Sequence, residues 1–391
     1  MSFAPSLSLF NRTRAAAGAP AGPSAGSKHF EALDGIRGIA ILVVLCAHFS
    51  TALSRTGWEG RLRDFAYYGY IGVTLFFVLS GFLITRILVQ TRDNAGYFRT
   101  FYARRSLRIF PLYYAYVAFV FLAYQPLAAR MLGRESIDPA RAWWFLSYLQ
   151  NLEPYAARVY DTGLTHLWSL AIEEQFYLAW PLAVYVTPRR WLLPLCGAGI
   201  VAAIGFRCHL FLTGGVDHDV YQATFSRMDA LLAGAAVGVV ELNEGARKRL
   251  SRHLGPIAAL SLAVILVIAA TPGSLGIMRR TSAIVGWTAL DVFFAAAVFW
   301  AATSGAGCRA LCARWLRLVG KYSYGIYVLH MIAFPIIDRV VPDGTLAGRL
   351  AQVALNLVAT AALTMASWHL LEAPFLRLKN SVRYAPATAT A

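Results

Sequence analysis

The chain has 391 residues, of which 58% are hydrophobic and only 14% are charged. Soluble globular domains have roughly 45–50% apolar and about 25% charged residues, so this composition excludes an ordinary cytosolic enzyme. Apolar runs of membrane-spanning length recur between residues 37 and 371, and about ten helices of ~20 residues would use nearly all of that length. The sequence therefore predicts an all-α, polytopic membrane helix bundle.

The formal net charge of +16 does not indicate nucleic-acid binding. The basic residues lie in short loops between apolar runs, and they do not gather on one face. They are typical of topology signals, so we expect a lipid bilayer and no nucleic acid as partner. The five cysteines form no CxxC pair and have no spacing to histidine that suits zinc. We expect no disulfide framework and no metal.

In chain order, residues 1–28 are rich in Ala, Gly, Ser and Pro and are expected to form a disordered cytoplasmic arm. Residues 29–376 are expected to form the membrane domain, and residues 377–391 a cytoplasmic tail. The aromatic segment 143–152 is too short to span, so an interfacial or re-entrant piece is expected there. No appended soluble domain is expected. The predicted spans lie at about 36–53, 71–91, 109–128, 167–187, 191–213, 227–242, 254–271, 283–303, 320–340 and 347–370.

The basic residues set the expected orientation of these ten spans. With the amino terminus inside, the inner loops carry the arginines at 92–108, 189–190 and 309–317 and the basic run at 247–252. The opposite loops hold fewer basic residues over a similar length. This positive-inside bias predicts that both termini are cytoplasmic.

Ionisable side chains within spans are costly in lipid and are the first functional candidates. On the first span, Arg37 and His48 are eleven residues apart, which is three helical turns, so both are predicted to face one cavity. They are separated by about 16 Å along the axis, which places Arg37 at the cytoplasmic mouth and His48 near mid-membrane. A structural histidine and a routine inner-face arginine remain the alternative.

A second inner cluster opens the third span, where Arg105 and Arg108 are spaced i, i+3, and Arg104 and Arg108 are spaced i, i+4. Guanidinium groups bind phosphates bidentately, so this cluster and Arg37 together form a candidate binding site for a phosphorylated cofactor. The alternative is a set of topological anchors.

A third candidate enters the membrane from outside, where His166, Ser169 and Glu173 are spaced i, i+3 and i+7 on one helix face. Glu174 is adjacent to Glu173 and therefore about 100° away around the helix. One of these acids is expected to line a cavity and the other to bind a neighbouring helix, and the spacing leaves open which does which.

Further polar residues within spans are weaker candidates. Arg227 and Asp229 are predicted to form an ion pair near the outer end of their span, and Asp291 to join a polar core or a proton path. Tyr327 and His330 lie in the stretch SYGIYVLH. The glycines at 234 and 238 have GxxxG spacing and, like those around the second span, favour close helix packing.

Seven blocks together resemble the family-3 membrane acyltransferases over almost the whole chain. They are LDGIRGIAILVVLCAHFS at 33–50, GYIGVTLFFVLSGFLITRIL at 69–88, FYARRSLRIFPLYY at 101–114, HLWSLAIEEQFYLAWPL at 166–182, FSRMDALLAGAAVG at 225–238, KYSYGIYVLH at 321–330 and LLEAPF at 370–375. The resemblance implies an O-acyltransferase of the bacterial inner membrane. Such proteins move acetyl or other short acyl groups from a coenzyme A thioester to hydroxyls of envelope glycans or macrolides.

The resemblance also implies roles for individual residues. The family has an arginine followed, after ten intervening residues, by a histidine, and this pattern matches Arg37 and His48. The family's Arg-x-x-Arg motif matches Arg105 and Arg108. Its Glu-Glu block matches residues 173 and 174. The position of Thr74 is often acidic in relatives, so an acid that some members supply there is absent from this chain.

These observations predict transfer from cytoplasmic acyl-CoA, most simply acetyl-CoA, to a sugar hydroxyl of an envelope polysaccharide or lipid-linked glycan. His48 is the expected general base, and Glu173 is expected to orient or balance its imidazolium. A covalent acyl-histidine route stays open. O-acylation of a macrolide or small glycoside is the alternative within the enzyme class. A membrane transporter or flippase, in which the same charges form a pathway, is the alternative from another class.

Overall fold

A computed structural model describes residues 30–132, 137–152, 163–214, 217–270, 280–304 and 308–384. Within these ranges every regular element is helical and none is a strand, so the predicted all-α bundle is confirmed. The arm predicted for residues 1–28 lies outside the described residues, as do residues 385–391 of the predicted tail.

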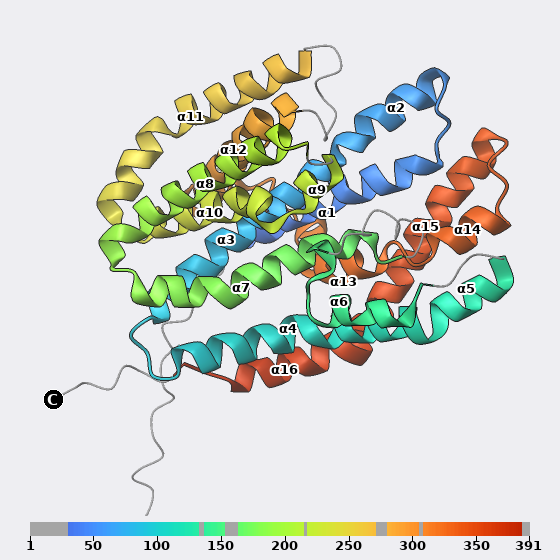
Figure 1. Ribbon diagram of the computed structural model, residues 1–391, viewed down its shortest axis with the longest axis horizontal. Helices are drawn as coiled ribbons and strands as arrows, with labels where there is room; N and C mark the ends of the chain where they lie inside the picture. Colours follow the sequence, from blue (N-terminus) through green and yellow to red (C-terminus); the bar gives the residue numbers. More distant parts are fainter. Residues whose placement is uncertain are drawn as a thin grey trace, which may run out of the picture.

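Sixteen α-helices run through the described ranges (Figure 1). They are α1 (Glu31–Phe49), α2 (Gly57–Tyr67), α3 (Ile71–Thr91), α4 (Tyr97–Phe119), α5 (Gln125–Leu132), α6 (Ala142–Leu146), α7 (Trp168–Val186), α8 (Leu192–Leu212), α9 (Asp217–Gln222), α10 (Thr224–Glu241), α11 (Glu244–Ala270), α12 (Trp287–Thr303), α13 (Arg314–Leu329), α14 (Phe334–Val340), α15 (Leu346–Ser367) and α16 (Ala373–Ser381). Short 3-10 turns, among them Thr165–Leu167 before α7, and π-helical segments such as Trp368–Glu372 before α16 join several of them.

Eight helical stretches in the described part of the chain are long and apolar enough to cross a membrane. They correspond to eight of the ten predicted spans. The remaining two predicted spans fall on α7 and on α13 with α14. Helix α7 has 19 residues but carries two adjacent glutamates, and α13 has only 16 residues, so neither is as long and as apolar as the others. The chain is a multi-pass membrane protein, and the number of ten crossings stays a prediction.

Close packing between α3 and α10 depends on glycine. A Cβ atom added to Gly81 would lie 1.9 Å from the carbonyl oxygen of Leu231, and one added to Gly234 would lie 1.9 Å from that of Val78. Only residues without a side chain allow backbones to approach this closely. The predicted packing role of these glycines is confirmed, and α3 is thereby held in the centre of the bundle.

One end of the bundle collects the segments that were predicted to lie inside. Arg92 at the end of α3 donates a 2.7 Å hydrogen bond to the carbonyl of Thr187 after α7. Arg104 on α4 donates to the carbonyls of Lys379 and Val382, at 3.2 and 2.6 Å. The loop between α3 and α4 and the far end of α16 accordingly lie together, at the left of Figure 1.

The opposite end carries α2 and α14, at the right of Figure 1. There Glu59 of α2 accepts two 2.7 Å hydrogen bonds from Arg349 of α15, which ties the α1–α2 segment to the start of α15. Helix α16 packs along α4, and the domain boundary predicted at 376/377 falls inside α16. The segment 143–152, predicted to be interfacial or re-entrant, forms α6 and short turns.

Asp93 and Arg55 are expected to be labelled from opposite sides of the membrane, with Asp93 on the cytoplasmic side. Both side chains are exposed, and they belong to the two opposite ends of the bundle. The measurement places Asp93→Cys or Arg55→Cys in a full chain whose native cysteines are replaced by alanine, and it uses a membrane-impermeant maleimide on intact cells. Permeabilised cells should label at both positions. Labelling of Asp93→Cys from outside would invert the predicted orientation.

Candidate active site

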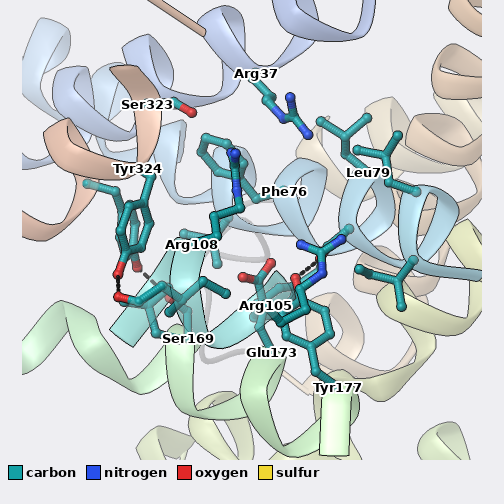
Figure 2. A pocket seen from close by; sticks show the side chains of 18 residues that line it. Arg37, Phe76, Leu79, Arg105, Arg108, Ser169, Glu173, Tyr177, Ser323 and Tyr324 are labelled. Atoms are coloured by element: carbon teal, nitrogen blue, oxygen red, sulfur yellow. Dashed lines mark hydrogen bonds between the residues drawn. The ribbon is translucent and has the colours of Figure 1, made fainter. Parts of the chain in front are cut away.

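A deep cavity lies between α1, α3, α4, α7 and α13 and collects most of the predicted site residues. Figure 2 shows the guanidinium groups of Arg37, Arg105 and Arg108 and the carboxylate of Glu173 directed toward it. Its remaining polar lining comprises Ser80, Ser169, Tyr177, Ser323, Tyr324 and Tyr327, and the rest is apolar. A polar chamber in an apolar bundle is a functional site by default.

Helix α4 supplies two of the three arginines. Arg105 and Arg108 are three residues apart on α4, so both point to the same side of the helix, as their spacing predicted. Among the described residues neither guanidinium has an ion-pair or hydrogen-bonding partner. Arg105 instead lies 5.2 Å above the ring centroid of Tyr177. Two arginines that line a cavity without a bound carboxylate leave their N–H donors available to an anionic ligand.

Arg37 is only partly available. Its Nη1 atom forms a 2.9 Å ion pair with Asp34, one turn earlier on α1. The other guanidinium donors remain directed toward the cavity, since an arginine offers five N–H groups. The structure thus brings Arg37 together with Arg105 and Arg108, as predicted.

The two adjacent glutamates of α7 face different ways, and only one of them lines the deep cavity. Glu173 lines the cavity. Glu174 does not, and its Oε1 atom is buried without a hydrogen-bonding partner in the described part of the chain. Next to Glu173, the hydroxyl groups of Ser80 and Tyr177 are hydrogen-bonded to each other. Ser80 of α3 also lines the cavity.

A second cavity lies outside the first, at the end of the bundle where α16 ends, and we call it the vestibule. It shares Arg37, Leu83, Arg105 and Arg108 with the deep cavity, so the two spaces meet at the three arginines. Its other lining residues are Phe30, Leu33, Asp34, Arg86, Ile87, Phe101, Arg104, Lys379 and Tyr384.

The vestibule is strongly cationic. Six of its lining residues are arginine or lysine and one, Asp34, is acidic. Arg86 is neutralised by Glu241 at 2.8 Å, and Arg104 is held by the carbonyls of residues 379 and 382. Lys379 forms no ion pair with any described residue. Lys379 and Tyr384 could not be predicted as site residues from the sequence, because their approach to α4 depends on the packing of α16.

Tyr327 and Ser169 form the inner wall of the deep cavity. Their hydroxyl oxygens are 2.5 Å apart, and both hydroxyls donate to the carbonyl of His166, at 2.8 and 3.3 Å. Tyr327 also accepts, through its carbonyl, a 2.7 Å hydrogen bond from Nδ1 of His330. One residue therefore belongs both to the cavity wall and to the group of histidines behind it.

Three histidines gather behind this wall, and His48 is one of them. Nδ1 of His48 lies 3.2 Å from Nε2 of His330, and the ring centroids of His166 and His330 are 4.8 Å apart. His48 lies in the last turn of α1 and is half-buried. The prediction that it faces the cavity of Arg37 is wrong, because neither cavity is lined by it. Helix α1 ends at Phe49, directly after His48, and the depth of this histidine in the membrane stays a prediction.

The pairing predicted between Arg227 and Asp229 is also wrong. Asp229 forms a 2.7 Å ion pair with Arg207 of α8, and both side chains are completely buried. Arg227 donates a 2.6 Å hydrogen bond to Thr74, and its guanidinium lies 4.6 Å from the ring centroid of Trp287. Residues two apart on a helix point to nearly opposite sides, so the two side chains of α10 reach different neighbours.

Asp291 of α12 lies in the same buried region. Its exposure is 1%, and neither carboxylate oxygen has a hydrogen-bonding partner among the described residues. With two arginines and two aspartates, the cluster of Arg207, Arg227, Asp229 and Asp291 has no net formal charge. It fits the predicted polar core, because buried charges are tolerated when they balance. Thr74 supplies a neutral acceptor to Arg227.

Comparison with known proteins gives the family. A family model described as an acyltransferase domain matches residues 30–369. The chain is 26% identical over 376 residues to the peptidoglycan O-acetyltransferase OatA of Listeria monocytogenes, covering 91% of this chain and 57% of that protein. It is 28% identical over 334 residues to the O-acetyltransferase OatA of Staphylococcus aureus, covering 79% and 51%.

The helix bundle makes the chain a multi-pass membrane protein, and the family match places it in the acyltransferase class. The chain belongs to the acyltransferase family whose model covers nearly all of its described residues, and the prediction of an enzyme that transfers acyl groups other than aminoacyl groups is confirmed at that level. The chain spans about half the length of the curated relatives it matches. No solved structure matches it.

Proposed function

We propose that this protein is an O-acyltransferase of the bacterial inner membrane that moves an acetyl or other short acyl group from cytoplasmic acyl-CoA to a sugar hydroxyl of a cell-envelope glycan. The observation that carries the proposal is the junction of the vestibule and the deep cavity at Arg37, Arg105 and Arg108. There a cationic entrance opens into a polar chamber within the bundle.

The vestibule suits the anionic end of coenzyme A. Arg105 and Arg108 have no carboxylate partner among the described residues, and planar guanidinium forks bind phosphate oxygens through paired, charge-assisted hydrogen bonds. Lys379 adds a point charge from α16. We therefore assign the phosphates of the donor to the vestibule, with Arg37 at its inner limit.

The deep cavity suits the rest of the donor. The pantetheine arm is narrow and uncharged, so it can pass the arginines and enter a chamber lined by Ser169, Tyr327 and apolar side chains. This path brings the thioester toward the wall formed by Tyr327. The acceptor approaches from the end of the bundle that carries α2 and α14, where His48 is partly exposed.

The proposed reaction uses His48 as general base. Nε2 of His48 takes the proton of the sugar hydroxyl while the hydroxyl oxygen bonds to the thioester carbonyl carbon. The tetrahedral intermediate then loses its carbon–sulfur bond, and the imidazolium returns the proton to the coenzyme A thiolate. Holding the two substrates in contact supplies most of the remaining acceleration.

An envelope glycan is the proposed acceptor because the relative from Listeria monocytogenes is named as a peptidoglycan O-acetyltransferase. An acceptor on the outer side also fits a base at the end of the bundle opposite the vestibule. The experiment below distinguishes among envelope polysaccharide, peptidoglycan and lipid-linked sugar as the acceptor.

The test supplies the purified chain, in lipid nanodiscs, with radiolabelled acetyl-CoA and an oligosaccharide of N-acetylglucosamine. We expect release of coenzyme A thiol coupled to an acetyl ester on the sugar that mild alkali removes. Mass spectrometry of envelope glycans from a deletion strain should show a lost acetyl group and so identify the natural acceptor. Movement of acetyl-CoA or glycan across sealed vesicles without ester formation would instead indicate a transporter.

A further inference from the structure

His48 has a partner that its sequence position does not reveal. His330 follows α13 directly, is fully buried, and places its Nε2 atom 3.2 Å from Nδ1 of His48. The two rings have centroids 4.9 Å apart. The residues are 282 positions apart in the chain, so only the packing of α1 against α13 brings them together.

The hydrogen bonds of His330 determine which of its nitrogens carries the proton. Nδ1 of His330 lies 2.7 Å from the carbonyl oxygen of Tyr327. A carbonyl oxygen can only accept, so this Nδ1 carries the hydrogen and donates it. In the neutral ring Nε2 then has the lone pair, and it is an acceptor facing His48.

The hydrogen-bonding partners of His48 determine its tautomer as well. Its Nδ1 atom faces two acceptors, the carbonyl oxygen of Val44 at 3.1 Å and Nε2 of His330 at 3.2 Å. Two acceptors around one nitrogen require that nitrogen to be the donor. The proton of His48 therefore lies on Nδ1, shared between Val44 and His330, and Nε2 is left with the lone pair that a general base needs.

We propose that His330 is the positioning residue of His48: it keeps the His48 proton on Nδ1, fixes the ring, and stabilises the imidazolium that forms when Nε2 takes a proton from the acceptor hydroxyl. This inference rests on the proposed function, in which His48 is the base. A neutral histidine replaces the carboxylate or carbonyl that commonly orients such a ring. Glu173, which the sequence suggested for this role, lines the deep cavity, and His48 does not line that cavity.

Among the described groups around the pair, His330 is the side chain that can orient the His48 ring. His166 touches the His330 ring, but its Nε2 donates to the carbonyl of Val328 at 3.0 Å, and its Nδ1 is buried without a hydrogen-bonding partner among the described residues. The other titratable side chains that pack against these rings are Tyr327, beside His330, and Tyr116, beside His166. No described carboxylate contacts any of the three rings, so neutral acceptors alone hold the His48 proton.

Two substitutions of His330 separate positioning from packing. His330→Phe keeps a ring of similar size and removes the acceptor, whereas His330→Gln keeps an acceptor oxygen and loses the ring. We expect His330→Phe to lower kcat for acetyl transfer by about ten- to hundredfold, a part of the 10²–10⁴ that a positioned base contributes. His330→Gln should recover much of that loss. KM for acetyl-CoA should not change, because the vestibule is formed by other residues.

The measurements are acetyl transfer from acetyl-CoA to the N-acetylglucosamine oligosaccharide and the imidazole ¹⁵N spectrum of the full chain in nanodiscs. In the wild type, the signals lost in His48→Ala should show the Nδ1–H tautomer, and His330→Phe should allow the Nε2–H form to appear. The matched control is His253→Phe, an exposed histidine of α11, which should change neither readout.

Three results would overturn the proposal: His330→Phe with wild-type kcat, a folded His330→Gln no better than His330→Phe, or a wild-type His48 protonated on Nε2. Folding is checked by size-exclusion chromatography and by acetyl-CoA binding. If the wild type transfers no acyl group from acetyl-CoA, the proposed function fails by itself. The ¹⁵N spectra then still decide whether His330 sets the tautomer of His48.

Discussion

His48→Gln is expected to lose acyl transfer by roughly 10²–10⁴-fold while the protein still inserts and still binds acetyl-CoA. Glutamine can hydrogen-bond to His330 and to the carbonyl of Val44, but it has no basic nitrogen that takes a proton. Acetyl-CoA binding should persist, because Arg37 at the vestibule lies about 16 Å away along α1. The measurements are single-turnover transfer and equilibrium binding of acetyl-CoA to the purified variant.

His48→Ala should be as inactive as His48→Gln if the residue is a base. His209→Gln provides the matched control, because His209 is exposed at the end of α8 and lines neither cavity. The wild-type rate should fall as the pH is lowered through the pKa of His48, since the protonated ring cannot accept another proton. A folded and fully active His48→Gln would move the chemistry away from this residue.

Features that depend on one helix could be predicted from the sequence. The 3.6-residue period alone places Arg105 and Arg108 on the same side of α4, and hydropathy alone finds the eight long apolar helices. The glycines at 81 and 234 were correctly assigned to packing, because a missing side chain has few other uses inside an apolar span.

Features that depend on two helices could not be predicted in this way. Glu173 and Glu174 differ by about 100° around α7, and only the position of α3 and α4 determines which one lines the cavity. The pairing of Asp229 with Arg207 required the packing of α10 against α8, whereas sequence proximity suggested Arg227. The contact between His48 and His330 could not be predicted either, since no local spacing connects α1 to α13.

The ends of α1 differ from the predicted span for another reason. The apolar run predicts a span over residues 36–53, whereas α1 begins at Glu31 and ends at Phe49. Glu31 and Asp34 continue the helix beyond its apolar part, since acids are favourable near a helix N-terminus. At the other end α1 stops at Phe49, so His48 lies closer to the end of the helix than the predicted span placed it.

Arg105→Ala and Arg108→Ala are each expected to weaken acetyl-CoA binding by about tenfold or more, and the loss in the double variant should be larger. Each guanidinium is proposed to make charge-assisted hydrogen bonds to a phosphate, which contribute about 1.5–3 kcal/mol apiece. The measurement is binding of acetyl-CoA, and of 3′,5′-ADP as its charged fragment, at two salt concentrations. Wild-type affinity should fall as salt is raised, and the alanine variants should show a weaker salt dependence.

Arg105→Lys should restore binding only in part, because an ammonium carries the charge but cannot form the planar fork. The matched control is Arg99→Ala, which removes an exposed arginine from the first turn of the same helix and lies outside both cavities. It should bind acetyl-CoA as the wild type does, which separates a specific site from the general basicity of this end of the bundle. Unchanged affinity in Arg105→Ala and Arg108→Ala would assign both residues to membrane topology, and the donor phosphates would then have to be sought at Arg86, Arg104 and Lys379 on the outer rim of the vestibule.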